Sequence, residues 1–329
     1  MAVTSKRSAT RCVEGSIPIV ALAGGVGGAK LVQGLASVLP AQDLTVVVNT
    51  GDDEVFHGLY ISPDLDTVMY SLAGLANRET GWGVAGDTFS ALGMLKRYGA
   101  VGTWFNLGDK DLATHLERTR LLREGWTLSQ ATAHLCEKLG IQVSLVPMSD
   151  QPVRTVVETE EGVLPFQEYF VKHQCRPRVK RVRFEGAKTA RISSSLEPAF
   201  RKAKALVMCP SNPIVSIGPI LAVPNVRSRL DGFKGLRLAV SPIVAGQALR
   251  GPAAKMLQEL GEEVSCVGVA RRLREVCDIF VIDMLDSDRQ QEIQALGLDM
   301  VVLDTVMNSD EDKARLARQI LQVLRDRLA

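Results

Sequence analysis

The sequence has few of the features that mark several protein classes. It contains six cysteines in 329 residues, and no two of them form a C-x-x-C pair. Their wide separation argues against a zinc ribbon or a disulfide framework and suits a reducing compartment. No apolar run reaches the roughly 18 residues that a membrane-spanning helix needs. We therefore expect no membrane association and a cytoplasmic location.

A strong charge of one sign is also missing. The 39 Lys and Arg residues against 37 Asp and Glu residues leave a formal net charge of +2. Binding to duplex nucleic acid depends on many phosphate contacts, so this balance gives no reason to expect a nucleic-acid partner. The apolar content of 46% and the charged content of 23% are near globular averages, which argues against disorder, collagen and coiled coil. At roughly 150 residues per domain, the length predicts two domains, or one large α/β body with an insertion.

Residues 1–16 are predicted to be a flexible leader. Lys6 and Arg7 precede the apolar residues 17–23, an arrangement that superficially resembles a signal peptide. The apolar run leads directly into a glycine cluster, however. We interpret it as a buried strand followed by a phosphate-binding turn.

The rest of the chain alternates between strand-like and helix-like patterns. Continuous apolar runs are typical of strands buried on both faces of a parallel sheet. Such runs occur at residues 17–23, 44–48, 206–209, 236–240, 279–282 and 300–303, and helices are predicted at 29–39, 87–98, 109–124, 129–139 and 310–328. The rhythm predicts a doubly wound, mostly parallel, Rossmann-like three-layer α/β fold, whose ligands bind beyond the carboxyl ends of the strands.

One segment departs from this rhythm. Residues 141–199 contain short β-like runs separated by turns, at 142–146, 153–159, 169–173 and 179–184. We expect a small antiparallel, β-rich subdomain inserted in an α/β domain made of residues 17–140 and 200–329. The basic, alternating residues 176–183 are expected to form a solvated face of it.

A glycine-rich turn follows the first strand. Backbone N–H groups approach an anion closely in such a turn, and the helix that it opens adds its positive end. The pattern is neither a Walker A loop nor a complete dinucleotide fingerprint, because Lys30 takes the third glycine position. A tight turn without a ligand is the alternative. The candidate phosphate-binding residues are Gly24, Gly25, Gly27, Gly28 and Lys30.

Four carboxylates lie within fifteen residues after the second strand. These are Asp52, Asp53, Asp64 and Asp66. Hard oxygen ligands of this kind suit Mg²⁺, which shares its coordination with water and substrate phosphates. Helix capping is an equally good reading of Asp53 and Asp64. We favour a functional role for Asp52 and Asp66, as ligands of the cation and as catalytic groups.

Two further stretches hold candidate binding residues. The rigid, polar loop at 210–219 follows the strand at 206–209, so it shares the ligand-binding edge and offers Ser211, Asn212, Ser216 and Gly218. Trp82, between two glycines, suits stacking on a flat ring, although packing in the core is as good a reading. His115 is more often a structural hydrogen-bonding residue than a catalyst.

Together these motifs resemble the 2-phospho-L-lactate transferase (CofD/FbiA) family of deazaflavin coenzyme F-420 biosynthesis. The ordered set comprises residues 24–30, 49–53, 62–70, 107–116, 147–150, 166–171, 210–221 and 241–246. The resemblance spans about residues 17–325. It implies transfer of a phospholactyl-type group from a guanosine diphosphate conjugate to the terminal ribityl hydroxyl of the deazaflavin Fo, with release of GMP and a requirement for Mg²⁺.

The resemblance also implies roles for individual residues. Asp66 and Asn106 match Fo-contacting positions, Asp52 matches a metal-binding position, and the loop at 210–219 matches the guanine-nucleotide side. The donor acid stays open among lactyl, enolpyruvyl and glyceryl conjugates, and a homodimer is expected. A non-catalytic sugar-nucleotide sensor of the same superfamily is the main alternative, followed by a nicotinamide dehydrogenase.

Overall fold

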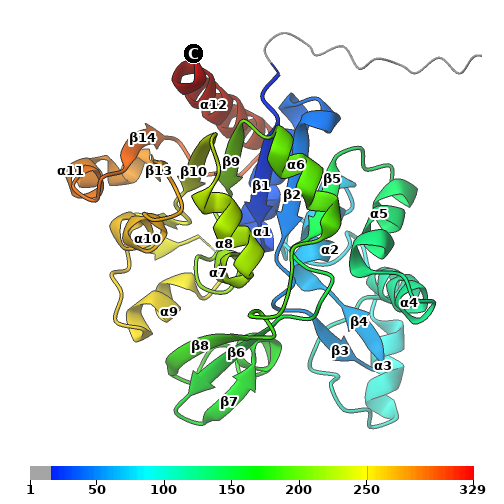
Figure 1. The fold of residues 1–329 in the computed structure, drawn as a ribbon. Helices are drawn as coiled ribbons and strands as arrows, with labels where there is room; N and C mark the ends of the chain where they lie inside the picture. Colours follow the sequence, from blue (N-terminus) through cyan, green and yellow to red (C-terminus); the bar gives the residue numbers. More distant parts are fainter. Residues whose placement is uncertain (1–15, 250) are drawn as a thin grey trace, which may run out of the picture.

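A computed structural model of the protein describes residues 16–249 and 251–329, so most of the predicted leader lies outside the described residues. Its centre is a seven-stranded sheet in which every pairing is parallel, in the order β14-β13-β10-β9-β1-β2-β5. The predicted doubly wound α/β fold is confirmed (Figure 1). The seven strands are β1 (Ile19–Ala23), β2 (Leu44–Val48), β5 (Ser144–Pro147), β9 (Ala205–Met208), β10 (Leu236–Val240), β13 (Ile279–Asp283) and β14 (Asp299–Leu303).

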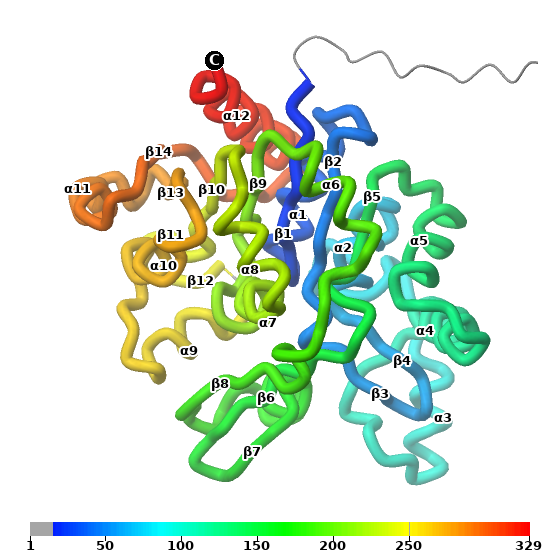
Figure 2. The backbone as a smooth tube through the Cα atoms, viewed as in Figure 1, coloured from blue at the N-terminus to red at the C-terminus, as the bar shows by residue number. Residues whose placement is uncertain are grey.

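Helices cover both faces of this sheet (Figure 2). One face packs against α1 (Gly25–Val38), α2 (Pro63–Leu72), α5 (Leu128–Lys138) and α12 (Asp310–Leu328). The other packs against α6 (Glu197–Lys202), α7 (Ile217–Ala222), α8 (Pro224–Asp231), α9 (Ala253–Glu259), α10 (Cys266–Leu273) and α11 (Gln290–Gln294). The helix α4 (Asp109–Arg123) packs against β4 (Leu59–Ile61), which forms a hairpin with β3 (Glu54–Phe56), and α3 (Ser90–Arg97) packs against α4.

The strands supply both halves of the core by alternation. In β1, Val20 and Leu22 belong to one apolar cluster, while Ile19 and Ala21 belong to the other. Because successive side chains of a strand point to opposite faces, an unbroken apolar run is what a strand between two helical layers requires. The sequence pattern and the three-layer architecture therefore share one physical cause.

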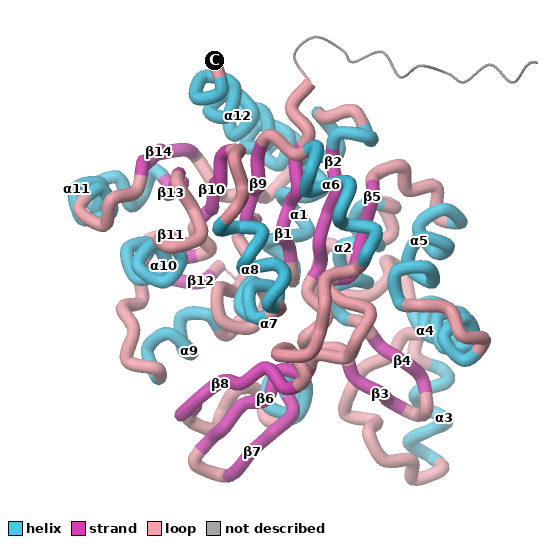
Figure 3. Tube along the Cα trace, in the orientation of Figure 1, coloured by secondary structure: helices cyan, strands magenta, loops and turns pink. Residues whose placement is uncertain are grey.

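The antiparallel sheet is smaller than the predicted insertion. It contains β6 (Arg154–Thr159), β7 (Gly162–Pro165) and β8 (Val179–Glu185), and it lies apart from the main sheet (Figure 3). The strand predicted at residues 142–146 is β5 of the main sheet, paired with β2. Its inclusion in the insertion was wrong. A short strand at the edge of the main sheet cannot be distinguished by its length from a strand of the small sheet.

Two local predictions also need correction. Residues 169–173 are predicted to form a strand, but Glu168–Lys172 form one helical turn, and Phe166, just before it, stacks on Phe170. Aromatic pairs at this spacing are typical of helices rather than strands. The helix expected from residue 29 begins at Gly25, so the glycine cluster forms the first turn of α1.

Short helical segments occupy several connections, at η1 (Ala41–Asp43), η2 (Glu168–Lys172), η3 (Ser194–Leu196) and η4 (Met284–Arg289), and a two-residue hairpin pairs β11 (Ile243–Val244) with β12 (Gln247–Ala248). Within the described residues, no helix combines the length and apolar character needed to cross a membrane. The five cysteines in the same part of the chain are free thiols.

Candidate functional site

A cavity of about 570 Å³ opens at the carboxyl edge of the main sheet, where β1, β2 and β9 end. The chain runs from β1 through α1 to β2 on one side of β1, and β9 lies on its other side. That reversal is the switch point at which doubly wound sheets bind ligands. The predicted site residues that line the cavity are Gly24, Gly25, Gly27, Lys30, Asp52, Asp66, Trp82, Asn106, Ser211, Asn212 and Ser216.

Two predicted residues, Gly28 and Gly218, are not part of this lining. A Cβ at Gly28 would collide with the Ser211 hydroxyl, and one at Gly218 would lie 3.0 Å from the Phe184 ring. Both glycines therefore permit close packing behind the cavity wall. Their sequence context did not distinguish that role from ligand contact.

The glycine turn holds α1 against two loops. Gly25 has a φ of +62°, which favours glycine, and its N–H donates to Asp64 Oδ1 at 2.7 Å. The N–H of Gly24 donates to Ser211 Oγ at 3.1 Å, and a Cβ at Gly27 would collide with the Pro210 carbonyl. The positive end of the helix thus already faces a carboxylate, Asp64, at the floor of the cavity.

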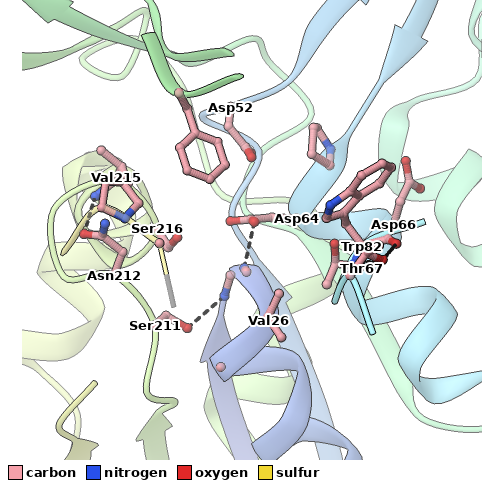
Figure 4. Close-up of a pocket in the computed structure, with 18 of the residues that line it drawn as sticks. Val26, Asp52, Asp64, Asp66, Thr67, Trp82, Ser211, Asn212, Val215 and Ser216 are labelled. Atoms are coloured by element: carbon pink, nitrogen blue, oxygen red, sulfur yellow. Dashed lines mark hydrogen bonds between the residues drawn. The ribbon is translucent and has the colours of Figure 1, made fainter. Parts of the chain in front are cut away.

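Asp52 and Asp64 form the first of two acidic groups, which we call the Asp52–Asp64 pair. The amide Nδ2 of Asn49 donates to Asp52 Oδ1 at 3.2 Å and to Asp64 Oδ2 at 2.9 Å. Asn49 is itself fixed, because its Oδ1 accepts the Gly51 N–H at 2.8 Å. Figure 4 shows Asp64 between Asp52 and the start of α1. One asparagine therefore holds two carboxylates from different segments together.

Burial makes this pair electrostatically costly. Asp52 is 6% exposed and Asp64 is 8% exposed. Burial raises the pKa of Asp52 well above its ordinary value, and the negative charges of Asp64 and Asp53 raise it further. Burial also raises the pKa of Asp64, although hydrogen bonds from Asn49, Gly25 and Ser216 offset part of the effect. The pair therefore favours any positive charge that reaches it.

Asp66 belongs to a second acidic group of opposite character, the Asp66–Arg118 pair. Arg118 on α4 has no solvent exposure, and its guanidinium binds both Asp66 oxygens, with Nη1 3.0 Å from Oδ2. Burial alone would lower the pKa of Arg118, but the Asp66 charge and hydrogen bonds raise it. The guanidinium therefore has a buried negative partner that favours its charged form.

Further side chains surround the Asp66–Arg118 pair. The Nδ1 of His115 lies 3.6 Å from Asp66 Oδ2, and its Nε2 lies 3.2 Å from Asp111 Oδ1. The Tyr70 hydroxyl donates to the same Asp111 oxygen at 2.7 Å. Asp66, Asp111 and His115 bring three potential metal-ligand atoms within 4.8 Å of one another. The fixed charge of Arg118 opposes a metal ion there.

Arg118 stands behind the cavity lining, and the sequence patterns did not predict its pairing with Asp66. Its position was included in a predicted helix, where an arginine is normally a solvated surface residue. The available signal was spacing: Asp111, His115 and Arg118 recur at intervals of four and three, which places them on one face of a helix. A cluster of polar side chains on the buried face of a helix indicates a binding or catalytic site.

The other acid-rich positions have separate roles. Asp53 accepts hydrogen bonds from the Tyr60 hydroxyl at 2.9 Å and the Ser62 hydroxyl at 2.7 Å, so it ties β4 to the start of α2. It does not belong to the cavity lining. Asp109 caps α3, accepting the Ser90 and Ala91 N–H groups at 2.9 Å. Asp53 thus binds two side-chain hydroxyls rather than the helix N–H groups that its capping interpretation required.

The two ends of the cavity differ in chemistry. Trp82, 43% exposed, lies on the Asp66 side of the cavity (Figure 4), and the cavity is also lined by Asn106, Phe105 and Phe170. At the other end Asn212 accepts the N–H groups of Ile214 and Val215 through Oδ1, at 2.9 and 3.3 Å, which fixes the side chain. Its Nδ2 has no hydrogen-bond partner among the described residues. The arrangement offers a flat aromatic wall at one end and rigid polar donors at the other (Figure 4).

Lys30 contributes a positive side chain to the cavity lining. Its Nζ donates to the carbonyl oxygen of Met307 at 2.7 Å, and both residues line the cavity. The amine is therefore held at the wall of the cavity by the segment that precedes α12.

The fold and this crevice define a doubly wound α/β protein with an acid-lined ligand site at its switch point. Comparison with known sequences narrows the class: the profile described as "2-phospho-L-lactate transferase CofD" matches residues 19–327. The chain belongs to this family. Similar relatives include a 2-phospho-L-lactate transferase from Methanosarcina mazei, 39% identical over 92% of this chain and 99% of its own. A phosphoenolpyruvate transferase from Streptomyces griseus is 40% identical over 93% and 98%.

Solved structures support the fold. A member of the UPF0052 family from Bacillus halodurans superposes with a TM-score of 0.62 over 92% of this chain and 98% of its own. Its sequence is only 14% identical, so the similarity concerns architecture alone. It agrees with the seven-stranded parallel sheet described above.

Proposed function

We propose that the protein transfers a phospholactyl-type group from a guanosine diphosphate conjugate to the ribityl hydroxyl of the deazaflavin Fo and releases GMP. The observation that carries this proposal is the single cavity of about 570 Å³ that joins the polar and aromatic ends across the acidic residues. A two-substrate transfer needs both reactants bound in one crevice, with their reacting atoms adjacent. Membership of the family and the names of the relatives support the same reaction class.

We assign the guanylylated donor to the polar end of the cavity. Asn212 offers an unpartnered and rigidly held amide donor there, Ser211 and Ser216 lie on the same side (Figure 4), and Lys30 also lines the cavity. Rigid donors bind a polar ligand with little ordering cost. The diphosphate then lies over the start of α1, close to Gly24, Gly25 and Gly27.

The donor set at the Asp52–Asp64 pair fits Mg²⁺. It consists of two buried carboxylates whose pKa values are raised by burial and, at Asp52, by neighbouring negative charges, so a divalent cation relieves both effects. Asp66 was predicted to share this cation, but its two oxygens already bind Arg118. We therefore assign the cation to Asp52 and Asp64. When bound, it would neutralise diphosphate charge.

The aromatic end suits the flat acceptor. Trp82 is exposed enough to stack on a ring system, and Asn106 supplies a polar contact beside it. The ribityl hydroxyl then lies near Asp66, which accepts its hydrogen bond. The hydroxyl oxygen attacks the phosphorus that carries the three-carbon acid. A phosphodiester forms, the bond to the GMP oxygen breaks, and the proton leaves the hydroxyl toward Asp66 or solvent.

The direct test mixes purified protein with Fo, Mg²⁺ and each guanylylated acid, namely lactyl, enolpyruvyl and glyceryl. Mass spectrometry should show a deazaflavin product heavier by the phosphoacyl group, together with GMP. The relatives named for phospholactate and for phosphoenolpyruvate are almost equally similar to this chain, so the assay, rather than identity, decides the donor. If none of the three donors yields a deazaflavin product, the result contradicts the proposal.

A non-catalytic sugar-nucleotide regulator is the second candidate. The polar end and the glycine turn suit a nucleotide in either case, but the aromatic end and the Asp66–Arg118 pair have no use in a sensor. Tight binding of a UDP-sugar without binding of Fo would favour the regulator. We further propose a cytoplasmic homodimer, which sedimentation of the purified protein tests.

A further inference from the structure

The buried Asp66–Arg118 pair has a role that its stability alone does not explain. Removing two opposite charges from water costs several kcal/mol per ion, and an apolar pair of similar volume is often as stable. The pair nevertheless lies at the wall of the cavity, and Asp66 lines it while Arg118 stands behind. The desolvation cost of the buried ion pair is therefore borne at the position where, in the proposed reaction, the acceptor hydroxyl binds.

Arg118 fixes the Asp66 carboxylate from the side that faces away from the cavity. Both Asp66 oxygens bind the Arg118 guanidinium, so rotation of the carboxylate would break two charge-assisted hydrogen bonds. Arg118 in turn lies 3.4 Å from His115 Nδ1, and His115 is buried beside Asp111. The polar side chains of α4 therefore hold the guanidinium in place, so it does not move with a rotated carboxylate.

The same pairing separates the two acidic groups. Asp66 is two residues from Asp64, and without a positive partner it would add a further negative charge to the cation site. The negative charge of Asp66 already acts on Asp52. Arg118 neutralises Asp66 locally, so the carboxylate remains available to accept a hydrogen bond from an alcohol.

We infer that Arg118 is a positioning residue for the acceptor: it holds Asp66 in the orientation that receives the terminal ribityl hydroxyl of Fo. This inference rests on the proposed function. Arg118 does not touch the substrate itself, and its effect passes entirely through Asp66. Binding of the guanylylated donor at the polar end of the cavity does not depend on it.

The test uses Arg118→Lys, which keeps a positive charge but loses the two-pronged geometry. Fo affinity is measured from the change in deazaflavin fluorescence with no donor and no cation present. We expect Fo binding to weaken about tenfold and kcat to fall by a similar factor, while the KM of the donor stays unchanged. Arg120→Met is the matched control, because Arg120 lies on the same helix but binds Glu117 and Glu124 at the surface.

A double-mutant cycle with Asp66→Asn separates positioning from a general structural role. If Arg118 acts through Asp66, then Arg118→Lys adds no further loss of Fo binding in the Asp66→Asn background. If Arg118→Lys does not fold, the neutral combination Arg118→Gln with Asp66→Asn is compared with Asp66→Asn alone, with the same expectation. Circular dichroism and thermal melting verify the fold of each variant.

Three results would overturn the inference. Wild-type Fo affinity in a folded Arg118→Lys variant would do so, as would an equal loss of donor and acceptor binding, or additive losses in the cycle. These outcomes differ from failure of the proposed function, in which the wild-type protein itself neither binds Fo nor forms product.

Discussion

The Asp52–Asp64 pair and the Asp66–Arg118 pair lie in one crevice, and they solve the problem of buried charge in opposite ways. Asp66 has a buried guanidinium against both oxygens. Asp52 and Asp64 have amide, hydroxyl and backbone donors, and the charges that act most strongly on Asp52 are negative. One pair has its counter-charge within the chain, whereas we propose that a bound cation completes the other.

This difference assigns a role to each pair. A carboxylate whose two oxygens bind an internal cation keeps its orientation in the free protein, so it suits a hydrogen-bond acceptor for an alcohol. Two carboxylates without such a partner store unfavourable electrostatic energy, which a divalent cation and a bound diphosphate relieve. Variants of each pair test this difference.

The largest expected effect is the loss of stability in Arg118→Met. Removing one partner of a buried ion pair leaves an uncompensated charge, which typically costs about 3–5 kcal/mol. Urea denaturation of the cation-free protein measures the free energy of unfolding. Addition of Asp66→Asn to this variant should recover part of the loss. An Arg118→Met variant as stable as the wild type would show that the pair is not electrostatically complete.

Asp52→Asn should have the opposite combination of effects. It removes a charge that nothing in the free protein balances, so the cation-free variant should be as stable as the wild type or slightly more so. Transfer activity should nevertheless fall by about a hundredfold, because the cation loses a ligand. Melting and product formation are measured on the same preparation, with Asp109→Asn as a control acid outside the cavity. Simultaneous loss of stability and activity would contradict the comparison.

The pH dependence of stability follows from the raised pKa values of Asp52 and Asp64. In the folded state both groups bind protons more tightly than in the unfolded chain, where their pKa is near 3.8. Their contribution to stability is therefore fully present below that value and is lost as the pH rises through the folded pKa. We expect the cation-free wild type to lose more stability than Asp52→Asn from about pH 4 to neutrality, measured by melting. Parallel curves for the two proteins would contradict the assignment.

The smallest effect is expected at the aromatic end. Trp82 is 43% exposed, so Trp82→Ala should change the free energy of unfolding by no more than about 0.5 kcal/mol. Loss of a stacking surface should raise the KM for Fo about tenfold and leave that for the donor unchanged. Trp126→Ala provides a control, since Trp126 is also partly exposed but lies outside the cavity lining. An unchanged KM for Fo in Trp82→Ala would show that the deazaflavin ring does not stack on Trp82.

Sequence patterns predicted the features that depend on local chemistry. The apolar run of β1 and the glycines after it specify a buried strand and a tight helix start, and both are present. Asp52 follows β2 and Asn212 follows β9, and both line one cavity because the carboxyl ends of parallel strands share an edge of the sheet.

Long-range pairing limited the remaining predictions. Arg118 follows Asp66 by 52 residues, and nothing local to either residue indicates that the two meet. The same holds for Asn49, whose contacts to Asp52, Asp64 and the Val215 carbonyl join three segments. The placement of β5 in the main sheet likewise depends on its pairing with β2 rather than on its own four residues.

Calorimetric titration of a divalent cation into the wild-type protein and three variants tests the central claim most directly. Asp52→Asn and Asp64→Asn should each weaken Mg²⁺ binding by at least about tenfold, because each removes a ligand, while Asp66→Asn should bind the cation as the wild type does. Loss of Mg²⁺ binding in Asp66→Asn, with wild-type binding in Asp64→Asn, would contradict the division of the crevice into a cation-binding pair and an internally neutralised pair.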